Sequence, residues 1–561
     1  MTGPGRPTAS PSGLSPHDDP SIVLDPVADP GGVALGATGA EAAVELPWPV
    51  MLHRRVHGRA QASRRYPWWV LTALLAGLFA LNFTFTVFVV ALPTVARQLH
   101  THVSVLTWVS TGPLLAFGLA APLFGRVGDL FGHRRLYLWG LAGATVAAVL
   151  TATAPDAPVL VAARCLDGVQ GAATGTASMA LILAMFAPAD RVKAMGWWSM
   201  VGAGGPVIGV TVGSPVIQYL GWRALFWGQL GLIAVALVVV ALVLPPHEPQ
   251  LDAEPAVQPV GGDPPAAEAD EPPGRGIDWL GSWSLSGSVI GVMLALSLGP
   301  VTGWRSPAVL VPGAVGATAL AAFVRRERRH PSPLIPVAYF RRRNFVLPMG
   351  TRAFGNFAYF GGFFLFPLLM EQVFHYSETQ VGLVSVARPL VFSLSAPVAG
   401  YMAARVGERA SSVAGAAAIV GSMVLFALLG AGGSLLVVIL ALVLSGLGMG
   451  VASPATSSSQ ANEVDPSELG VMSAAQQLSA QVGEVAGIQV VVTVQETLAR
   501  HRAGVSSHAP AHAPAHAPAH AAALLGSFHT AFWVGAGVAV AGLVCSVFIR
   551  DFKRSPERDR P

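Results

Sequence analysis

The chain has 561 residues, of which 53% are apolar and only 11% are charged. A soluble protein of this length needs far more charged side chains to cover its surface. The composition therefore excludes a soluble protein and a largely disordered one, and it indicates an all-α, polytopic membrane protein. The net charge is only +4, so the positions of the basic residues matter more than their number.

The first 65 residues are polar and rich in Pro and Gly, without a long apolar run. We interpret residues 1–65 as a disordered cytoplasmic tail. Met51 begins a basic segment that is typical of the lead-in to a first membrane helix. Translation from Met51 rather than Met1 is therefore an alternative, which N-terminal mass spectrometry of the native protein would decide.

Fourteen apolar runs reach the roughly 20 residues that a membrane-spanning helix needs. They cover residues 68–93, 104–124, 136–154, 157–186, 195–217, 224–244, 279–299, 307–324, 345–371, 380–403, 411–430, 435–458, 470–497 and 527–549. We expect a domain organisation of six helices, an inserted pair, and six helices again. In residue numbers, this gives an N-terminal bundle (66–244), an acidic Pro-rich cytoplasmic linker (245–278), the inserted pair (279–324), a basic cytoplasmic segment (325–344), a C-terminal bundle (345–549, with a His/Pro-rich extracellular loop at 499–526) and a cytoplasmic tail (550–561).

Basic residues cluster in every second loop between these runs. Examples are Arg134 with Arg135, Arg191 with Lys193, and the seven arginines between residues 325 and 343. Arg and Lys concentrate in short cytoplasmic loops. The pattern therefore predicts a multi-pass protein of the cell membrane with both termini in the cytoplasm.

Residues 119–135 and 394–409 form an internal repeat with a constant offset of 275 residues. The matching pairs are Leu119/Leu394, Ala121/Ala396, Pro122/Pro397, Gly125/Gly400, Gly132/Gly407 and Arg134/Arg409. Both copies follow the second span of a bundle and lie on the same side. The sequence therefore predicts two parallel six-helix halves with a substrate site between them, which is one of the known transporter plans.

The first copy of the repeat carries two charged residues. Asp129 lies between Gly125 and Gly132, and Arg134 follows Gly132. We interpret this loop as a structural and gating contact on the cytoplasmic face rather than as a binding site. An acid at the start of the following helix would also suit the dipole of that helix. The second copy has Ala404 in place of Asp129.

Four segments together resemble the major facilitator superfamily, and in particular its fourteen-helix drug:proton antiporter branch. They are GRVGDLFGHRR at 125–135, RCLDGVQGAATG at 164–175, GAGGPVIGVTVG at 202–213 and the basic segment 323–345. The resemblance implies a secondary transporter that works as a monomer in the bilayer on a small-molecule substrate. It implies a proton gradient as the energy source. It also implies that the protein is not an enzyme and that it binds no cofactor, metal or nucleic acid.

The third segment holds Gly205, Pro206, Gly209 and Gly213. Glycines four residues apart share one helix face and let another backbone approach closely, and a proline can kink the helix. Ordinary tight packing explains this spacing. The resemblance implies in addition that the face lies against the opposite half and favours exchange over uniport.

Arg164 and Asp167 lie three residues apart within the fourth span, hence on one helix face. Charges inside a membrane are costly and often functional. The pair could hold the transported proton or contact substrate, or it could be a static ion pair. In the family branch, an Asp usually precedes the pattern Ala-Leu-Pro in helix one by seven residues. Here that position is Thr84, so the acid could have moved to Asp167.

Two further charges lie inside the C-terminal spans. Glu484 stands next to Gly483 and is a second candidate proton carrier. It could instead neutralise an arginine such as Arg388 or line a wet cavity. Arg388 itself could receive an anionic group of a substrate or pair with an acid.

The segment 508–520 repeats His at a fixed spacing: His508, His512, His516 and His520. Because a proline recurs with the same period, we expect a flexible loop rather than a helix that aligns the imidazoles in a metal site.

The sequence thus predicts proton-coupled efflux of small lipophilic compounds or drugs by alternating access. The alternatives are an exporter of one dedicated metabolite or lipid with weak or no proton coupling, which the missing helix-one acid favours, and a non-transporting membrane sensor.

Overall fold

The structure is a computed structural model. It describes residues 65–84, 95, 98–101, 108–244, 278–330, 335, 337–502 and 518–551. These residues form long α-helices and two short 3-10 helices. The predicted tail 1–65 except Arg65, the linker 245–278 except Asp278, and His508, His512 and His516 lie outside the described residues.

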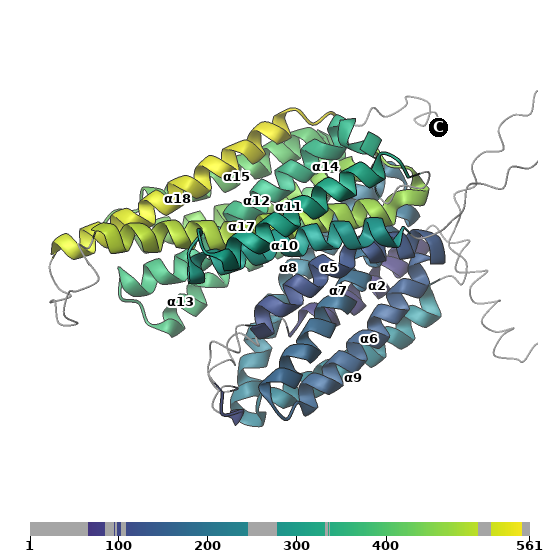
Figure 1. The fold of residues 1–561 in the computed structure, drawn as a ribbon, viewed down its shortest axis with the longest axis horizontal. Helices are drawn as coiled ribbons and strands as arrows, with labels where there is room; N and C mark the ends of the chain where they lie inside the picture. Colours follow the sequence, from purple (N-terminus) through teal and green to yellow (C-terminus); the bar gives the residue numbers. More distant parts are fainter. Residues whose placement is uncertain are drawn as a thin grey trace, which may run out of the picture. The chain divides into compact units, whose positions relative to one another are not determined.

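In the described residues, six helices form the N-terminal half, coloured purple to blue in Figure 1. They are α2 (Tyr66–Asn82), α5 (Trp108–Phe131), α6 (His133–Thr153), α7 (Ala157–Met185), α8 (Pro188–Leu220) and α9 (Trp222–Val243). The second of these helices runs seven residues beyond the predicted end at 124. Asp129 therefore lies in the last turn of a helix and not in a loop.

The inserted pair and the C-terminal half follow in teal to yellow (Figure 1). The pair is α10 (Trp279–Thr302) and α11 (Pro307–Glu327), and η1 (Val337–Arg341) leads into the C-terminal half. That half comprises α12 (Arg343–Gln372), α13 (Glu378–Ser385), α14 (Ala387–Val406), α15 (Glu408–Ala427), α16 (Leu435–Ala461), η2 (Pro466–Glu468), α17 (Leu469–Arg502) and α18 (Pro518–Val547).

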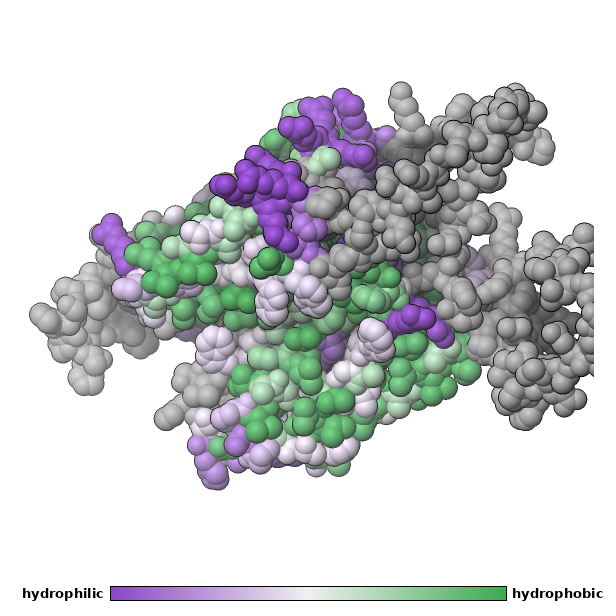
Figure 2. Space-filling model, turned by 45° about the vertical axis from the view of Figure 1, so that its right-hand side comes forward, coloured by the Kyte–Doolittle hydropathy of each residue, from purple (hydrophilic) through white to green (hydrophobic). Residues whose placement is uncertain are grey.

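Each predicted span corresponds to a helix in the described residues, with α13 and α14 together forming the tenth. Eleven spans are long and apolar enough to cross a membrane. The lipid-facing character is plain on α9, where Leu232, Val235, Val238 and Leu242 are exposed. Figure 2 shows hydrophobic residues, in green, over much of the visible face of the molecule. The chain is a multi-pass membrane protein.

The predicted loop 499–526 is shorter than expected. Helix α17 continues to Arg502, and α18 begins at Pro518, so His520 lies in the first helical turn. A proline in the first turn of a helix loses no hydrogen bond that the helix would use. The basic segment 325–344 is also partly helical, because α11 reaches Glu327 and α12 begins at Arg343.

Hydrogen bonds bring the arginine-containing loops to one end of the molecule, as the alternation of basic residues predicts. Arg134 donates to the carbonyl of Ala241, and Tyr66 donates to that of Val243. The backbone N–H of Arg409 donates to Asp551. We call this end, where α5, α7, α11, α14 and α16 finish, the arginine-rich end.

Asp278 joins the two inserted helices at the arginine-rich end. It caps α10 by accepting from the Gly281 N–H at 2.9 Å, and it pairs with Arg326 of α11 at 2.8 Å. Burial opposes its charge, but these bonds outweigh burial and hold its pKa below the usual range. Since a depressed carboxyl pKa stabilises the folded state above the unfolded pKa, this contribution is complete at neutral pH and is lost only as the pH falls through the folded-state pKa.

The inserted pair packs on only one of the two junctions between the halves. Helix α10 contacts both α5 and α17. Ser286 donates a 2.7 Å hydrogen bond to the carbonyl of Leu119, and Met293 and Val289 lie against Gly118. The other junction, between α8 and α14, has no comparable contact with α10 or α11 among the described helices.

The internal repeat is confirmed by backbone conformation and packing. Gly132 and Gly407 occupy the same place before α6 and α15, with φ of 93° and 105°. A Cβ on Gly125 would lie 2.8 Å from the Gly470 carbonyl of α17. One on Gly400 would lie 2.7 Å from the Val192 carbonyl of α8. One repeat glycine thus lies at each of the two close helix contacts between the halves, Gly125 where α5 meets α17 and Gly400 where α14 meets α8.

We expect Gly132→Ala and Gly407→Ala each to destabilise the protein by about 1–3 kcal/mol, because L side chains avoid this backbone region. The melting temperature in detergent measures the effect. Gly202→Ala is the control, since nothing lies within 4 Å of the place that its Cβ would take and alanine favours a helix. Equal stability of all three variants would contradict the conclusion that the backbone at Gly132 and Gly407 requires glycine.

Candidate site between the two halves

Asp129 connects the two halves at the arginine-rich end. Its Oδ1 accepts from the N–H of Gly470 at 2.8 Å, and its Oδ2 accepts from that of Val471 at 3.0 Å. These are the first free N–H groups of α17, where a helix dipole favours an anion. His133 Nε2 lies 3.0 Å from the same carboxylate. Asp129 does lie at the start of a helix whose dipole favours an anion. That helix is α17, so the expectation that it would be the following helix, α6, is wrong.

A cation makes the complementary contact nearby. Arg191 of α8 donates to the carbonyls of Leu183 at 2.8 Å and Ala461 at 3.1 Å, and to Asn462 Oδ1 at 3.0 Å. Arg191 thus caps the C-terminal ends of α7 and α16, where backbone carbonyls have no partner within the helix. Asn462 in turn donates to Glu408, whose charge acts on Arg191. From sequence alone, Arg191 is only a loop charge.

Further hydrogen bonds cross between the halves deeper in the bundle, one of them from Ser393 of α14 to the carbonyl of Met200 at 3.0 Å. Ser199 of α8 and Ser453 of α16 share a buried bond of 3.0 Å. Gln481 of α17 donates to the carbonyl of Leu114 at 3.2 Å. Small or uncharged polar groups therefore hold the halves together inside the membrane region.

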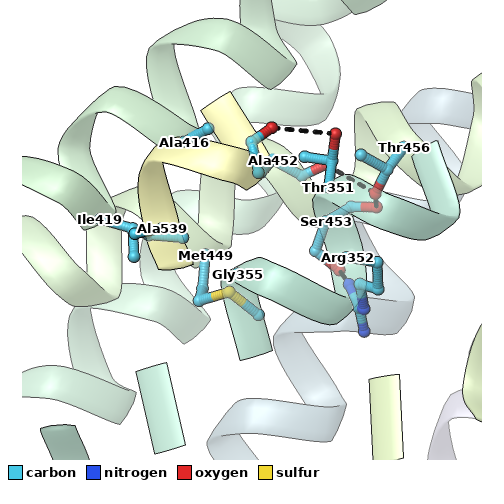
Figure 3. A pocket seen from close by; sticks show the side chains of 11 residues that line it. Thr351, Arg352, Gly355, Ala416, Ile419, Met449, Ala452, Ser453, Thr456 and Ala539 are labelled. Carbon is cyan, nitrogen blue, oxygen red and sulfur yellow. Dashed lines mark hydrogen bonds between the residues drawn. The ribbon is translucent and has the colours of Figure 1, made fainter. Parts of the chain in front are cut away.

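Ser453 is also the partner of Arg352, an arginine that is absent from the residues predicted from sequence. Arg352 Nη1 donates to Ser453 Oγ, and Figure 3 shows both residues beside a narrow cavity. The cavity has about 10 Å³ of space for the centre of a water molecule, enough for one water. A charge within the apolar run 345–371 is the signal that could have found it.

Glu484 lies on α17, and the cation that acts on it is Arg352. Both side chains keep part of their surface accessible. The alternative that Glu484 balances an arginine is therefore consistent with Arg352; among the described residues no ion pair joins Glu484 to Arg388, although both act on Tyr359. The structure thus brings together Glu484, Arg352, Ser453 and Ser199 from four helices.

Arg164 and Asp167 form an ion pair of 2.5 Å within α7. The second oxygen of Asp167 accepts from Gln170 at 2.8 Å. Arg164 is 2% exposed, and its guanidinium lies 6.0 Å from the ring of Phe226. Both carboxylate oxygens are therefore engaged by donors on their own helix.

The glycines of the helix-five motif pack differently from the expected arrangement. A Cβ on Gly205 would lie 2.9 Å from Asn82, and Gly209 faces the carbonyl of Phe83. Both contacts are with α2 of the same half, so the expectation that this face meets the opposite half is wrong for them. The neighbouring Gly204 meets Ser393 of α14 instead.

The remaining motif positions lie in the same region. Pro206 and Gly213 are within α8, which stays helical through both. Thr84 follows the end of α2, is fully buried, and its hydroxyl has no hydrogen-bond partner in the part of the chain that the structure describes. Arg388 lies in the first turn of α14. It therefore belongs to the C-terminal half, whereas Thr84 belongs to the N-terminal half.

We expect Asp129→Asn to loosen the arginine-rich end, because it removes the charge that binds two backbone N–H groups, worth about 1.5–3 kcal/mol. The reporter is the buried Ser473→Cys in a C165S/C545S background. Its maleimide labelling in detergent should accelerate about tenfold or more. Asp190→Asn is the control, because Asp190 pairs with Lys193 of its own helix. Unchanged labelling would contradict the role of Asp129.

Comparison with known proteins agrees with this architecture. A solved human organic anion transporter has a TM-score of 0.57 at 18% identity, covering 86% of this chain and 99% of its own. A proton:xylose symporter scores 0.59 at 12% identity, covering 87% and 96%. At these identities, both show the fold alone.

Sequence relatives are more informative. A tetracenomycin C resistance and export protein of Streptomyces glaucescens is 27% identical over 78% of this chain and 77% of its own length. A puromycin resistance protein of Streptomyces alboniger is 30% identical over 76% and 81%. The family model described as Major Facilitator Superfamily matches residues 73–270 and 271–488. The chain belongs to the Major Facilitator Superfamily, in the branch that includes drug-efflux transporters, and is a transmembrane transporter.

Proposed function

We propose that this chain exports small lipophilic organic compounds by alternating access, driven by protons that enter through Glu484. The names of the antibiotic-resistance relatives support export of such compounds. We take the arginine-rich end to face the cytoplasm of a cell membrane, because Arg and Lys concentrate on that side. On this proposal, a single chain is the functional unit, and the proton gradient is the only energy source.

The observation that carries the proposal is the connection from Glu484 to the junction of the halves. The charge of Glu484 acts on Arg352, which donates to Ser453, and Ser453 bonds Ser199 of the other half. Protonation of Glu484 removes the negative charge that balances Arg352. The guanidinium of Arg352 then has a different preferred position. A shift of this group changes its hydrogen bond to Ser453, and with it the bond between Ser453 and Ser199 across the halves. Proton binding and the arrangement of the halves are therefore coupled, and coupling of this kind is reciprocal.

Asp167 is the weaker candidate for the proton carrier. Arg164 and Gln170 occupy its two oxygens, and ionised carboxylates are stabilised by such donors. A group that must bind and release a proton during each cycle needs a partner that can leave. We therefore assign Arg164 and Asp167 a structural role as a static pair that shapes the interior of the N-terminal half.

Thr84 favours a second candidate function, export of one dedicated metabolite or lipid without proton coupling. Its buried hydroxyl replaces the acid that the family branch usually has in helix one. The two functions differ in whether an imposed pH gradient drives flux.

Flux in proteoliposomes tests the proposal. A pH gradient should drive uptake from a panel of tetracenomycin C, puromycin and lipophilic dyes of both charges. We expect Glu484→Gln to abolish the gradient dependence, because glutamine cannot take up a proton. Glu496→Gln is the matched control on the same helix, at an exposed position. Wild-type flux that ignores the gradient would reject proton coupling and favour the dedicated exporter.

Asp167→Asn should give the opposite pattern. The substitution leaves the buried guanidinium of Arg164 without its counter-ion, which costs about 3–5 kcal/mol. We expect a lower melting temperature in detergent, while the flux that remains still follows the pH gradient. Loss of gradient dependence in a protein of normal stability would show that Asp167, and not Glu484, carries the proton.

A further inference from the structure

Arg388 is a fully buried cation inside the C-terminal half. Its Nη2 donates to Ser445 Oγ at 2.5 Å. Its Nε and Nη1 have no hydrogen-bond partner among the described residues. Two aromatic rings hold the guanidinium in place, with ring centres at 4.1 Å for Tyr359 and 5.9 Å for Phe363. The side chain is thus fixed without an acid, and two of its nitrogens are unused.

Arg388 differs in this respect from the other arginines inside the described spans. Asp167 balances Arg164, and Glu484 acts on Arg352. Among the described residues no carboxylate forms an ion pair with Arg388; its electrostatic partner is Tyr359, on which Glu484 also acts. Buried charges in a membrane normally have a counter-ion or line a transport path. Deep inside the described spans of the C-terminal half, two arginines, Arg352 and Arg388, therefore stand against one acid, Glu484.

Another unused donor lies on the helix face that Arg388 packs against. Asn356, Tyr359 and Phe363 follow each other on one face of α12 at spacings of three and four residues. The amide nitrogen of Asn356 is buried and has no partner in the described residues. Arg352, one turn earlier on the same face, is partly accessible. This face therefore presents hydrogen-bond donors in excess of acceptors, next to aromatic rings.

The described interior of the N-terminal half does not reverse this imbalance. Its acid Asp167 is already engaged by Arg164 and Gln170, and Thr84 is buried and uncharged. The interior therefore favours anions over cations.

We propose that the transported compounds are aromatic organic anions, carboxylates or phenolates, and that Arg388 receives their negative oxygen. A guanidinium fork matches a carboxylate with two parallel hydrogen bonds. Asn356 supplies a further N–H, and the rings of Tyr359 and Phe363 contact the aromatic body of the compound. This assignment rests on the proposed export function and adds the substrate class to it.

Binding to the full-length protein in lipid nanodiscs tests the assignment. The probes share one naphthalene ring and differ in the attached group: 2-naphthaleneacetate, 2-naphthaleneethylammonium and 2-naphthaleneethanol. We expect the carboxylate to raise the melting temperature of the wild type most. Arg388→Gln should weaken its binding roughly tenfold or more, as loss of a hydrogen bond to a charged group does. Arg405→Gln is the control, an exposed arginine on the same helix.

The stability of the ligand-free variant separates a binding role from a structural one. Arg388→Gln removes an uncompensated buried charge, so the free variant should be no less stable than the wild type. Arg388→Lys keeps the charge without the fork and should retain a weaker preference for the carboxylate.

Three results would overturn the assignment: equal or no stabilisation of the wild type by the carboxylate relative to the other probes, a preference for the ammonium, or an unchanged preference in Arg388→Gln. Wild-type selectivity decides the question even if both variants fail to fold. A carboxylate preference without gradient-driven flux would instead reject the proposed transport function and leave the binding site intact.

Discussion

The unpaired backbone groups at helix ends govern how the two halves meet. A helix end leaves N–H or C=O groups that its own helix cannot satisfy, so they must find partners elsewhere. Here the partners come from the opposite half: Asp129 at the start of α17 and Arg191 at the end of α16. The sign of each charge suits the dipole of the helix it contacts. Because neither helix end can satisfy itself, closure of this end depends on both halves.

Much of the architecture can be predicted from local sequence. The length of each apolar run sets the number of spans, and the run of basic loops identifies the common end. Gly132 and Gly407 recur because a backbone with positive φ needs glycine, whatever lies around it. The relation between the halves is therefore visible as a repeat. Features of this kind depend on a few neighbouring residues and on the bilayer, not on distant parts of the chain.

The pairing of charges across helices cannot be predicted in the same way. Apolar spans show no polar face, so sequence does not reveal which side of a helix meets which neighbour. Sequence alone pairs Asp129 with its own following helix, and the family resemblance places Gly205 against the other half; both expectations are wrong. Arg352 does not stand out although its charge is visible, because its partner Glu484 is more than 130 residues away. These errors share one cause, the unknown register between helices.

The position of α10 makes the two junctions unequal. Helix α10 covers the junction of α5 with α17, whereas the junction of α8 with α14 has no such neighbour among the described helices. Leu394, Val398 and Met402 of α14 are exposed. The twofold relation of the halves therefore does not extend to their surroundings: an extra layer of protein backs one junction, whereas neither inserted helix backs the other.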